Sequence, residues 1–439
     1  MTVDIDRDSR EQARQLLDFV DASPSPWHAV ATMETKLQSM GFVRLHEPEH
    51  WELQQGGRYY VVRDGSSIII FGIGHGGLDE FKFNIVGAHT DSPGLRVKPN
   101  GAHRAGKMSR IGVEVYGGPI LATFSDRDLS LAGRIGYKNS DGSVQSRLVC
   151  FESALMRLPN LAIHMNREVN KKGLLLKKQD QLPLLLSNIE EGQNPQNYFY
   201  SLLADKAGCD KDAILSFELN VFDTQKGVFY GVNEEFIANS QLDNLASCHA
   251  GMTALLQSGE SNPPATTVAA FFDHEEVGSE STKGADGSFL GDTLERISLA
   301  LGIDREGYKR ALAKSFAISA DMAHAYQPNF PEAYEPDHRV QVNKGPVIKT
   351  NASQRYSSES VSESRFIRLC QEVDIPWQKY SHRTNIPCGS TIGPITAARL
   401  GIRSVDVGNP IWAMHSIRES GGVLDHGYLI SVLREFYLT

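Results

Sequence analysis

The hydrophobic pattern near the start of the chain predicts two helices. Between Ser9 and Met40, apolar residues recur every three or four positions, as they do on one face of a helix: Ala13, Leu16, Leu17, Val20, Ala29, Met33 and Leu37. The segment Ser23-Pro24-Ser25-Pro26 interrupts this pattern, because proline removes a helical hydrogen bond and clashes with the preceding turn. We therefore expect a break between two helices here.

Beyond the first helices, the spacing of apolar runs changes twice. Strand-like runs occur first at 59–62, 67–71 and 83–86, and then, after Pro99, at the closer spacing of 113–115, 120–124, 129–135 and 143–150. The stretch from Asn166 to Asp212 shows no sustained period. After Ser240, helical patterns alternate with buried strands at 242–257, 267–272, 290–301, 315–320, 358–373, 390–400 and 423–436.

This order predicts one domain inserted into another. An α/β pattern that gives way to a β-rich stretch and then resumes is typical of such an insertion. We expect an α/β fold, with a mostly parallel sheet sandwiched by helices and formed by residues 1–98 and 233–439. The inserted β-rich domain would span 99–232. A chain of 439 residues with 41% hydrophobic content can supply a core for each part.

Composition narrows the class of protein. The formal net charge of −9 argues against a nucleic-acid-binding protein, which would need a basic face. The acidic N-terminus lacks the apolar core of a secretory signal, and no apolar run approaches membrane-spanning length. We therefore expect no membrane partner. The five cysteines are dispersed without a C-x-x-C pair, which disfavours structural zinc and a disulfide framework and fits a reducing cytoplasm. Any metal would therefore be held by histidine and carboxylate.

Three of the predicted strands run directly into residues that can bind metal: Asp273-His274-Glu275-Glu276, His89-Thr90-Asp91, and Asp321 with His324 just beyond. In an open α/β sheet, functional sites collect at the carboxyl ends of the strands. Adjacent carboxylates are costly to bury unless a cation or a reacting proton shares their field. The three strand ends therefore predict one shared metal site.

Five residues are the candidate ligands of this site: His89, Asp243, Glu276, Asp321 and His415. A set of imidazoles and carboxylates suits Zn²⁺, and also Mn²⁺ or Co²⁺, whereas an all-oxygen set would suit Mg²⁺ or Ca²⁺. Two metals about 3.5–4 Å apart would need a bridging carboxylate.

Two further acids have candidate roles beside the ligands. Glu275 leaves the same strand end as Glu276 but faces the other way, so it is a candidate general base that moves a proton from water to a leaving amine. Asp91 is placed to hydrogen-bond a ligand imidazole and fix its tautomer. Taken singly, these residues have ordinary interpretations: a glutamate pair often starts a helix, and Asp243 could be a helix N-cap. Their joint occurrence at strand ends favours the metal site.

The chain resembles the M18 family of metallopeptidases, the aspartyl aminopeptidases, along nearly its whole length. The motifs that carry the resemblance include His89-Thr90-Asp91-Ser92-Pro93, Gly112-Val113-Glu114-Val115-Tyr116-Gly117-Gly118, Asp126-Arg127-Asp128-Leu129, Asp273-His274-Glu275-Glu276-Val277-Gly278-Ser279, Asp321-Met322-Ala323-His324-Ala325, Gly345-Pro346-Val347-Ile348-Lys349, Pro387-Cys388-Gly389-Ser390-Thr391-Ile392-Gly393-Pro394 and Met414-His415-Ser416-Ile417-Arg418-Glu419. One departure is Asn385, where the family pattern implies an aspartate.

The resemblance implies two metal ions per subunit, most simply Zn²⁺. His89 and Asp321 would hold one ion, Glu276 and His415 the other, and Asp243 would bridge them, with Glu275 as general base. It also implies that the insert is a dimerisation domain within a tetrahedral dodecamer built from dimers. His164 is similar to a family histidine that reaches the active site of a neighbouring subunit, although its sequence context alone suggests a buried histidine at a β-edge.

The function expected on this basis is a cytoplasmic aminopeptidase that removes N-terminal residues from peptides, with Asp or Glu preferred. Because the net charge of −9 repels an acidic substrate, that preference needs a local cation. Lys349 is the first candidate, with Arg355 and Arg383 as alternatives, and His324 is a further substrate-binding candidate. Two other functions stay open: a metal-dependent deacylase or amidohydrolase acting on small amides, and a catalytically idle oligomeric scaffold.

Overall fold

The computed structural model describes residues 5–439, and its largest element is a nine-stranded sheet. The spatial order of the strands is β1-β2-β3-β13-β4-β14-β18-β16-β17. Their bounds, in that order, are Val43–Leu45, Arg58–Arg63, Ser67–Gly72, Thr266–Phe272, Phe83–His89, Phe316–Ala320, Arg403–Gly408, Val347–Thr350 and Gln378–Ser381. The four central strands β13, β4, β14 and β18 run parallel, and antiparallel pairs join them to β3 and β16. The predicted α/β class with a mostly parallel sheet is confirmed.

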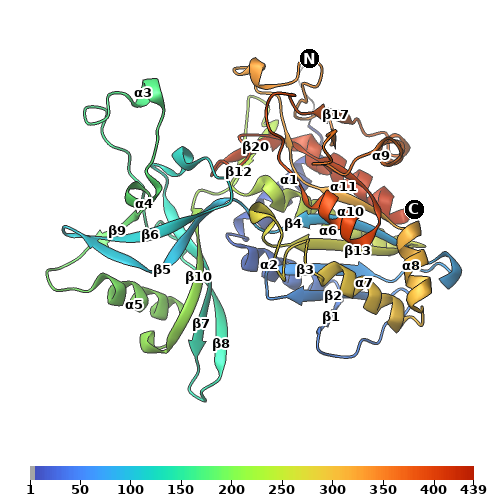
Figure 1. Cartoon of the computed structure of the whole chain (residues 1–439), viewed down its shortest axis with the longest axis horizontal. Coiled ribbons are helices and arrows are strands. Elements are labelled where there is room, and N and C mark those ends of the chain that lie inside the picture. Colours follow the sequence, from blue (N-terminus) through green and yellow to red (C-terminus); the bar gives the residue numbers. More distant parts are fainter. Residues whose placement is uncertain (1–4) are drawn as a thin grey trace.

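Helices cover both faces of this sheet (Figure 1). One face carries α1 (Arg7–Asp21), α2 (Pro26–Ser39), α6 (Leu242–Ser258), α9 (Ser360–Glu372) and α11 (Val423–Leu438), and the other carries α7 (Phe289–Ala300), α8 (Arg305–Lys314) and α10 (Ile392–Leu400). Because side chains alternate along a strand, Val86 and Ala88 of β4 join the first core, whereas Phe83 and Ile85 join the second. A strand buried on both faces takes mostly apolar residues, which explains the nearly continuous apolar runs in the sequence. Asn84 is the polar exception within β4, and its side-chain amide donates a hydrogen bond to the Phe436 carbonyl.

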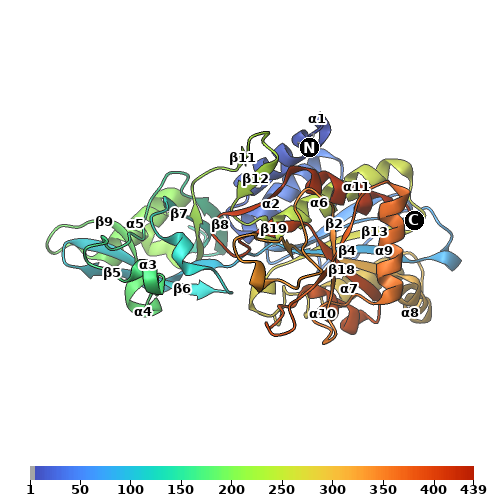
Figure 2. The ribbon, with the colours of Figure 1, turned by 90° about the horizontal axis from the view of Figure 1, so that it is seen from above.

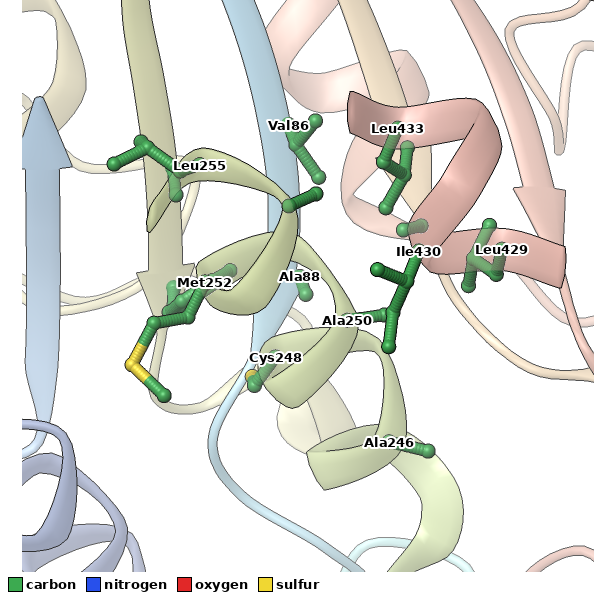
Figure 3. Packing of buried hydrophobic residues seen from close by; sticks show 14 of the residues in the cluster. Val86, Ala88, Ala246, Cys248, Ala250, Met252, Leu255, Leu429, Ile430 and Leu433 are labelled. Atoms are coloured by element: carbon green, nitrogen blue, oxygen red, sulfur yellow. The ribbon is translucent and has the colours of Figure 1, made fainter. Parts of the chain in front are cut away.

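Residues of β4, α6 and α11 pack together in the first core. Figure 3 shows small residues of α6, Ala246, Cys248 and Ala250, facing Ala88 of β4 on one side and α11 on the other. These small side chains let the helix lie close to the sheet, so that α6 is firmly seated. This packing fixes the start of α6, where Asp243 lies with non-helical backbone angles (φ −81°, ψ 104°).

The predicted break between the first two helices is present and is capped on both sides. The C-cap of α1 is Ala22, and α2 begins after Ser25, whose hydroxyl accepts a hydrogen bond from the His28 N–H. Pro26 occupies the first helical position, where its missing N–H costs nothing.

A second, six-stranded sheet lies at one end of the elongated molecule (Figure 2). Its order is β8-β7-β10-β5-β6-β9, with bounds Val144–Cys150, Leu129–Lys138, Ile214–Asp223, Gly94–Ala105, Met108–Tyr116 and Leu184–Asn188. All pairs in it are antiparallel, and α5 (Pro195–Ala207) packs on it, with the short helices α3 (Val169–Lys172) and α4 (Lys178–Gln181) nearby. This second sheet has a core of its own, separate from the two cores of the large sheet.

A third sheet of five short strands connects the other two. Its order is β11-β12-β20-β19-β15, with bounds Val228–Tyr230, Phe236–Asn239, Glu419–Gly422, Pro410–Trp412 and Ala323–His324. Strand β12 leads into α6. Strand β20 pairs antiparallel with β12, with Asn239 opposite Glu419. This pairing brings the start of α6 next to the loop between β19 and β20.

One prediction of local structure is wrong: the segment 120–124 is not a strand, because residues Leu121–Phe124 form a 3-10 helix. The stretch 166–212 has no regular period, yet it contains α5, which buries only Phe199, Leu203, Ala204 and Ala207 against the second sheet. So narrow an apolar stripe gives a weak helical pattern. Within residues 5–439, no helix has both the length and the apolar character needed to cross a bilayer.

Candidate metal centre

The three acidic strand ends meet because their strands are neighbours. β4 lies between β13 and β14 and runs parallel to both, so their carboxyl ends share one edge. His89 is paired with Phe272, the last residue of β13. Asp321 lies two residues beyond Ser319, whose partner is Gly87, and it is therefore level with His89. Asp243 and His415 reach the same edge from the third sheet.

The five candidate ligands form two groups that share Asp243. In the first group, His89 Nε2 lies 3.4 Å from Asp243 Oδ1 and 3.6 Å from Asp321 Oδ1. In the second, His415 Nε2 lies 3.4 Å from Asp243 Oδ2 and 3.6 Å from Glu276 Oε1. Within each group, the potential ligand atoms all lie within 4.8 Å of one another. The two oxygens of Asp243 therefore face two different histidines, as a bridging carboxylate would.

Burial and charge show that this cluster is incomplete without a cation. Asp243 is 3% exposed, and its Oδ1 is buried without a hydrogen-bond partner. Four carboxylates, those of Asp243, Glu275, Glu276 and Asp321, lie around only two imidazoles. An orphaned buried carboxylate oxygen and an excess of negative charge are both costly unless the group binds a metal. Mixed imidazole and carboxylate donors fit Zn²⁺ well.

The pKa values follow from this crowding. Burial raises the pKa of Glu276 well above its ordinary value, and the charge of Asp243 adds to the effect. Burial alone would lower the pKa of His415, but contact with Asp243 and the charge of Glu276 raise it to about 10. For Asp243, burial alone would raise the pKa, but contacts with His415 and His89 hold the pKa of this carboxyl far below its usual range. A bound cation would displace the protons that otherwise offset this charge.

Glu275 stands beside the two groups and faces a cavity of about 560 Å³. Its Oε2 is 3.8 Å from His89 Nε2. Burial raises its pKa to about 8, against the opposing charge of His89, and the negative charges of Asp321, Asp91 and Asp243 add to the rise. Glu275 lines the cavity together with all five candidate ligands, His89, Asp243, Glu276, Asp321 and His415. A carboxylate in this position can exchange a proton with a molecule bound there.

Asp91 contacts the imidazole of His89, as expected, but mainly through its backbone carbonyl. The backbone carbonyl of Asp91, and not its carboxylate, is the nearer partner of His89 Nδ1, at 3.0 Å against 3.4 Å. The carboxylate instead accepts hydrogen bonds from the backbone N–H groups of Glu275, at 3.2 Å, and Glu276, at 3.1 Å. Asp91 therefore orients the imidazole of His89 through its backbone carbonyl and fixes the Glu275-Glu276 turn through its side chain.

Glu419 is a positioning residue that the sequence reasoning missed. It is 2% exposed, and its two oxygens accept hydrogen bonds from the backbone N–H of Asp243, at 2.9 Å, and of His415, at 2.7 Å. One carboxylate thus holds the backbone of Asp243 and that of its neighbour His415 in fixed positions. Its presence in the motif around His415 was visible, but Asp243 lies 176 positions away and nothing local indicates the contact.

Lys349 lies in the wall of the cavity, whereas the two arginine alternatives do not. Its side chain is 2% exposed, and Nζ donates to the carbonyls of Asp321, at 2.8 Å, and Met322, at 3.1 Å. Among residues 5–439, it is the only lysine or arginine that lines this cavity. Arg355 is exposed, and Arg383 donates to Asn385 Oδ1 and the Tyr334 carbonyl. Asn385, the departure from the family pattern, is exposed as well.

The other two candidate histidines lie in different surroundings. His324 lines the cavity and packs edge-on against Tyr380, and burial lowers its pKa to about 4, so its imidazole is neutral. His164 is exposed in a turn between β8 and β9, away from the cavity. The expectation of a buried β-edge position for His164 is therefore wrong, because the segment that carries it projects from the second sheet without pairing.

A cluster of histidines and carboxylates at the carboxyl edge of an α/β sheet, with a free carboxylate beside it, places the protein among metal-dependent hydrolases. The sequence model described as "Aminopeptidase I zinc metalloprotease (M18)" matches residues 19–437, almost the whole chain. The chain belongs to the M18 family of metallo-aminopeptidases.

Individual relatives agree with this assignment. The chain is 46% identical over 433 residues to the probable M18 family aminopeptidase 2 of Stutzerimonas stutzeri (strain A1501), covering 98% of each sequence. It is 45% identical over 426 residues to the protein of that name from Azotobacter vinelandii, covering 96% of this chain and 97% of the relative. Among solved structures, the cryo-EM structure of the Ape4 and Nbr1 complex contains a chain with 38% identity and a TM-score of 0.95, matched over 98% of this chain and 86% of that one.

Proposed function

We propose that this aminopeptidase binds two divalent metal ions per subunit and preferentially releases N-terminal Asp or Glu from peptides. The observation that carries the proposal is the pair of ligand groups sharing Asp243, whose two oxygens face His89 and His415. His89 and Asp321 would hold one ion, and Glu276 and His415 the other. Zn²⁺ is the ion that the donor set and the family description favour, with Mn²⁺ and Co²⁺ as alternatives.

The chain's own residues supply binding and proton transfer. Ions bound here would acidify a coordinated water and stabilise negative charge on the scissile carbonyl oxygen. Glu275 Oε2, beside both groups and open to the cavity, takes a proton from the attacking water and delivers it to the departing amine nitrogen. Asp91 keeps Glu275 in place by holding its backbone N–H.

Lys349 is the residue that we infer recognises the acidic side chain of the substrate. It is buried in the cavity wall with two of its three N–H groups directed at backbone carbonyls. Asp321 Oδ2 lies 3.7 Å from Nζ, and both residues line the cavity. We infer that the third N–H group of Nζ is available to a substrate carboxylate bound in that cavity. A buried ammonium within an otherwise acidic site would attract a carboxylate and repel a basic side chain.

Replacing Lys349 with Met should therefore lower kcat/KM for an Asp amide far more than for Ala or Leu amides. A desolvated charge pair of this kind is worth about 2–5 kcal/mol. The measurement is a comparison of the three substrates in wild type and Lys349→Met, with metal content determined in parallel. Lys379→Met is a matched control, because Lys379 on the adjacent strand β17 pairs with Glu363 at the surface.

An equal fall for all three substrates, accompanied by loss of metal, would make Lys349 a support for Asp321 and would remove it from substrate recognition.

We also infer that subunits assemble through the β-rich region 99–232, as a tetrahedral dodecamer built from dimers. A solved relative, described as the S. cerevesiae mApe1 dodecamer, has 25% identity and a TM-score of 0.86, matched over 98% of this chain and 97% of that one. The exposed apolar side chains of Leu161, Ile163 and Met165 lie on either side of His164 and would be covered by a neighbouring subunit. His164 would then reach that neighbour's cavity. The five free cysteines fit assembly in the cytoplasm.

Subunit mixing tests whether His164 acts in a neighbouring site. His164→Ala and Glu275→Gln assemblies should each be inactive, but dissociating and reassembling them together should regain activity. Random mixing in a symmetric assembly would restore about a quarter of the sites. Each variant alone, taken through the same cycle, is the control. If mass spectrometry shows mixed assemblies and activity is not regained, His164 does not contribute across subunits.

A further inference from the structure

The end of strand β6 in the second sheet reaches the metal centre with three consecutive residues, Tyr116, Gly117 and Gly118. Tyr116 Oη donates a hydrogen bond of 2.6 Å to Asp91 Oδ2, on the carboxylate that holds the N–H groups of Glu275 and Glu276. The ring of Tyr116 is buried beneath the guanidinium of Arg96, which lies 3.5 Å from the ring centroid. Because Arg96 lies on β5, the hydroxyl is held in place by the second sheet itself.

Gly117 packs directly against Glu276. A Cβ added at Gly117 would lie 3.1 Å from Glu276 Cβ, 3.3 Å from its carbonyl oxygen and 3.4 Å from Oε2. The backbone at Gly117 has φ +65°, a conformation that favours glycine. The absence of a side chain thus lets β6 approach one of the candidate ligands at van der Waals distance.

Gly118 holds the other ligand of the same group. Its carbonyl oxygen accepts a hydrogen bond of 3.1 Å from His415 Nδ1, which directs Nε2 toward Asp243 and Glu276. Two residues later, the Ile120 N–H donates to the His415 carbonyl at 2.9 Å. The ring and the backbone of His415 are therefore both fixed by the segment that leaves β6.

We propose that Tyr116-Gly117-Gly118 is a positioning element through which the second sheet sets Glu276 and His415 for metal binding. None of the three residues belongs to the candidate ligand groups, although Gly118 lines the cavity. They act by fixing the side chain of one ligand, the ring tautomer of another and the turn that carries Glu275. The inference rests on the proposed two-ion site. If the inference is right, contacts from the second sheet strengthen the binding of the metal ion that Glu276 and His415 would hold.

The test compares Gly117→Ala with Gly106→Ala in the full-length assembly. Gly106 lies in the turn between β5 and β6, has φ +60° and has nothing within 4 Å of an added Cβ. Both substitutions impose the same left-handed strain, but only the first presses on Glu276. We expect Gly117→Ala to bind one of two Zn²⁺ ions about 10–100-fold more weakly, as for other residues that orient ligands. Gly106→Ala should bind both ions as wild type does.

Tyr116→Phe is the second variant, because it keeps the buried ring and removes only the hydroxyl that Asp91 accepts. We expect it to weaken the same ion, by about 10-fold. Zn²⁺ affinity is measured by competition with a chromophoric chelator, and assembly by light scattering. Unchanged affinity in Tyr116→Phe, or equal losses in the two glycine variants, would overturn the inference. If the wild-type protein binds fewer than two ions, the two-ion proposal is refuted. The effect of Gly117→Ala and Tyr116→Phe on the affinity for the single bound ion would then decide whether the element positions ligands.

Discussion

Glu275→Gln is expected to leave the assembled enzyme with its full metal content and almost no turnover. The substitution keeps the size of the side chain but removes the group that moves the proton, and general acid–base catalysis contributes roughly 10²–10⁴-fold. Its neighbour Glu276 provides the matched comparison, because only Glu276 lies in the group with Asp243 and His415. Glu276→Gln should therefore lose metal as well as activity.

Elemental analysis of the two variants, together with single-turnover kinetics, separates these roles. The contradictory outcome is loss of metal in Glu275→Gln with metal retained in Glu276→Gln. The roles of the two glutamates would then be exchanged. The structure also contains a third grouping of His89, Glu275 and Glu276 within ligand distance, which is the arrangement that such a result would favour.

The second large effect is expected at Asp243. Asp243→Ala should lose both metal ions together, whereas His415→Ala should lose mainly one. A bridging carboxylate neutralises part of the charge of both cations, and without it they would repel each other across a few ångströms of buried, poorly screened space. Native mass spectrometry of the subunits gives the number of ions directly.

Asp273 is the control for this prediction. It is a fully buried carboxylate in the same motif as Glu275, but it pairs with Lys283 at 3.0 Å and stands outside the ligand groups. Asp273→Asn removes the nearer of the two carboxylates that pair with the Lys283 ammonium and leaves only Asp64, at 3.5 Å, so we expect a lower Tm with metal content unchanged. If Asp243→Ala keeps both ions, the residue is a helix-start residue and the two-ion proposal fails.

The fold class and the meeting of the strand ends were predictable because each depends on a strong local pattern. β4, β13 and β14 are buried on both faces, so apolar residues dominate their sequences, and polar residues follow at the sheet edge. Parallel neighbours then bring those ends together without further information. Asp243 and His415 were harder to place from pattern alone, since they reach the site through the short strands of the third sheet.

The contacts that hold the ligands in place could not be predicted in this way. Glu419 meets Asp243 across 176 positions, and Tyr116 meets Asp91 only because β6 of the second sheet points at the metal centre. The burial of Lys349 depends on the backbone carbonyls of Asp321 and Met322, which no side-chain pattern reveals. The 3-10 turn at Leu121–Phe124 follows from the same approach of β6, because the chain must turn there to contact His415 and Ile417.

The most direct test of the proposed function is to titrate metal-free wild-type enzyme with Zn²⁺ while following the release of Asp from a peptide with a free N-terminus. Bound ions per subunit are counted at each point, and an Ala peptide and an N-acetylated Asp peptide are run alongside. We expect no release without metal, full activity at two ions per subunit, faster release of Asp than of Ala, and no cleavage of the acetylated peptide. Full activity without metal would contradict the account. So would faster hydrolysis of the acetylated peptide, which would identify a deacylase.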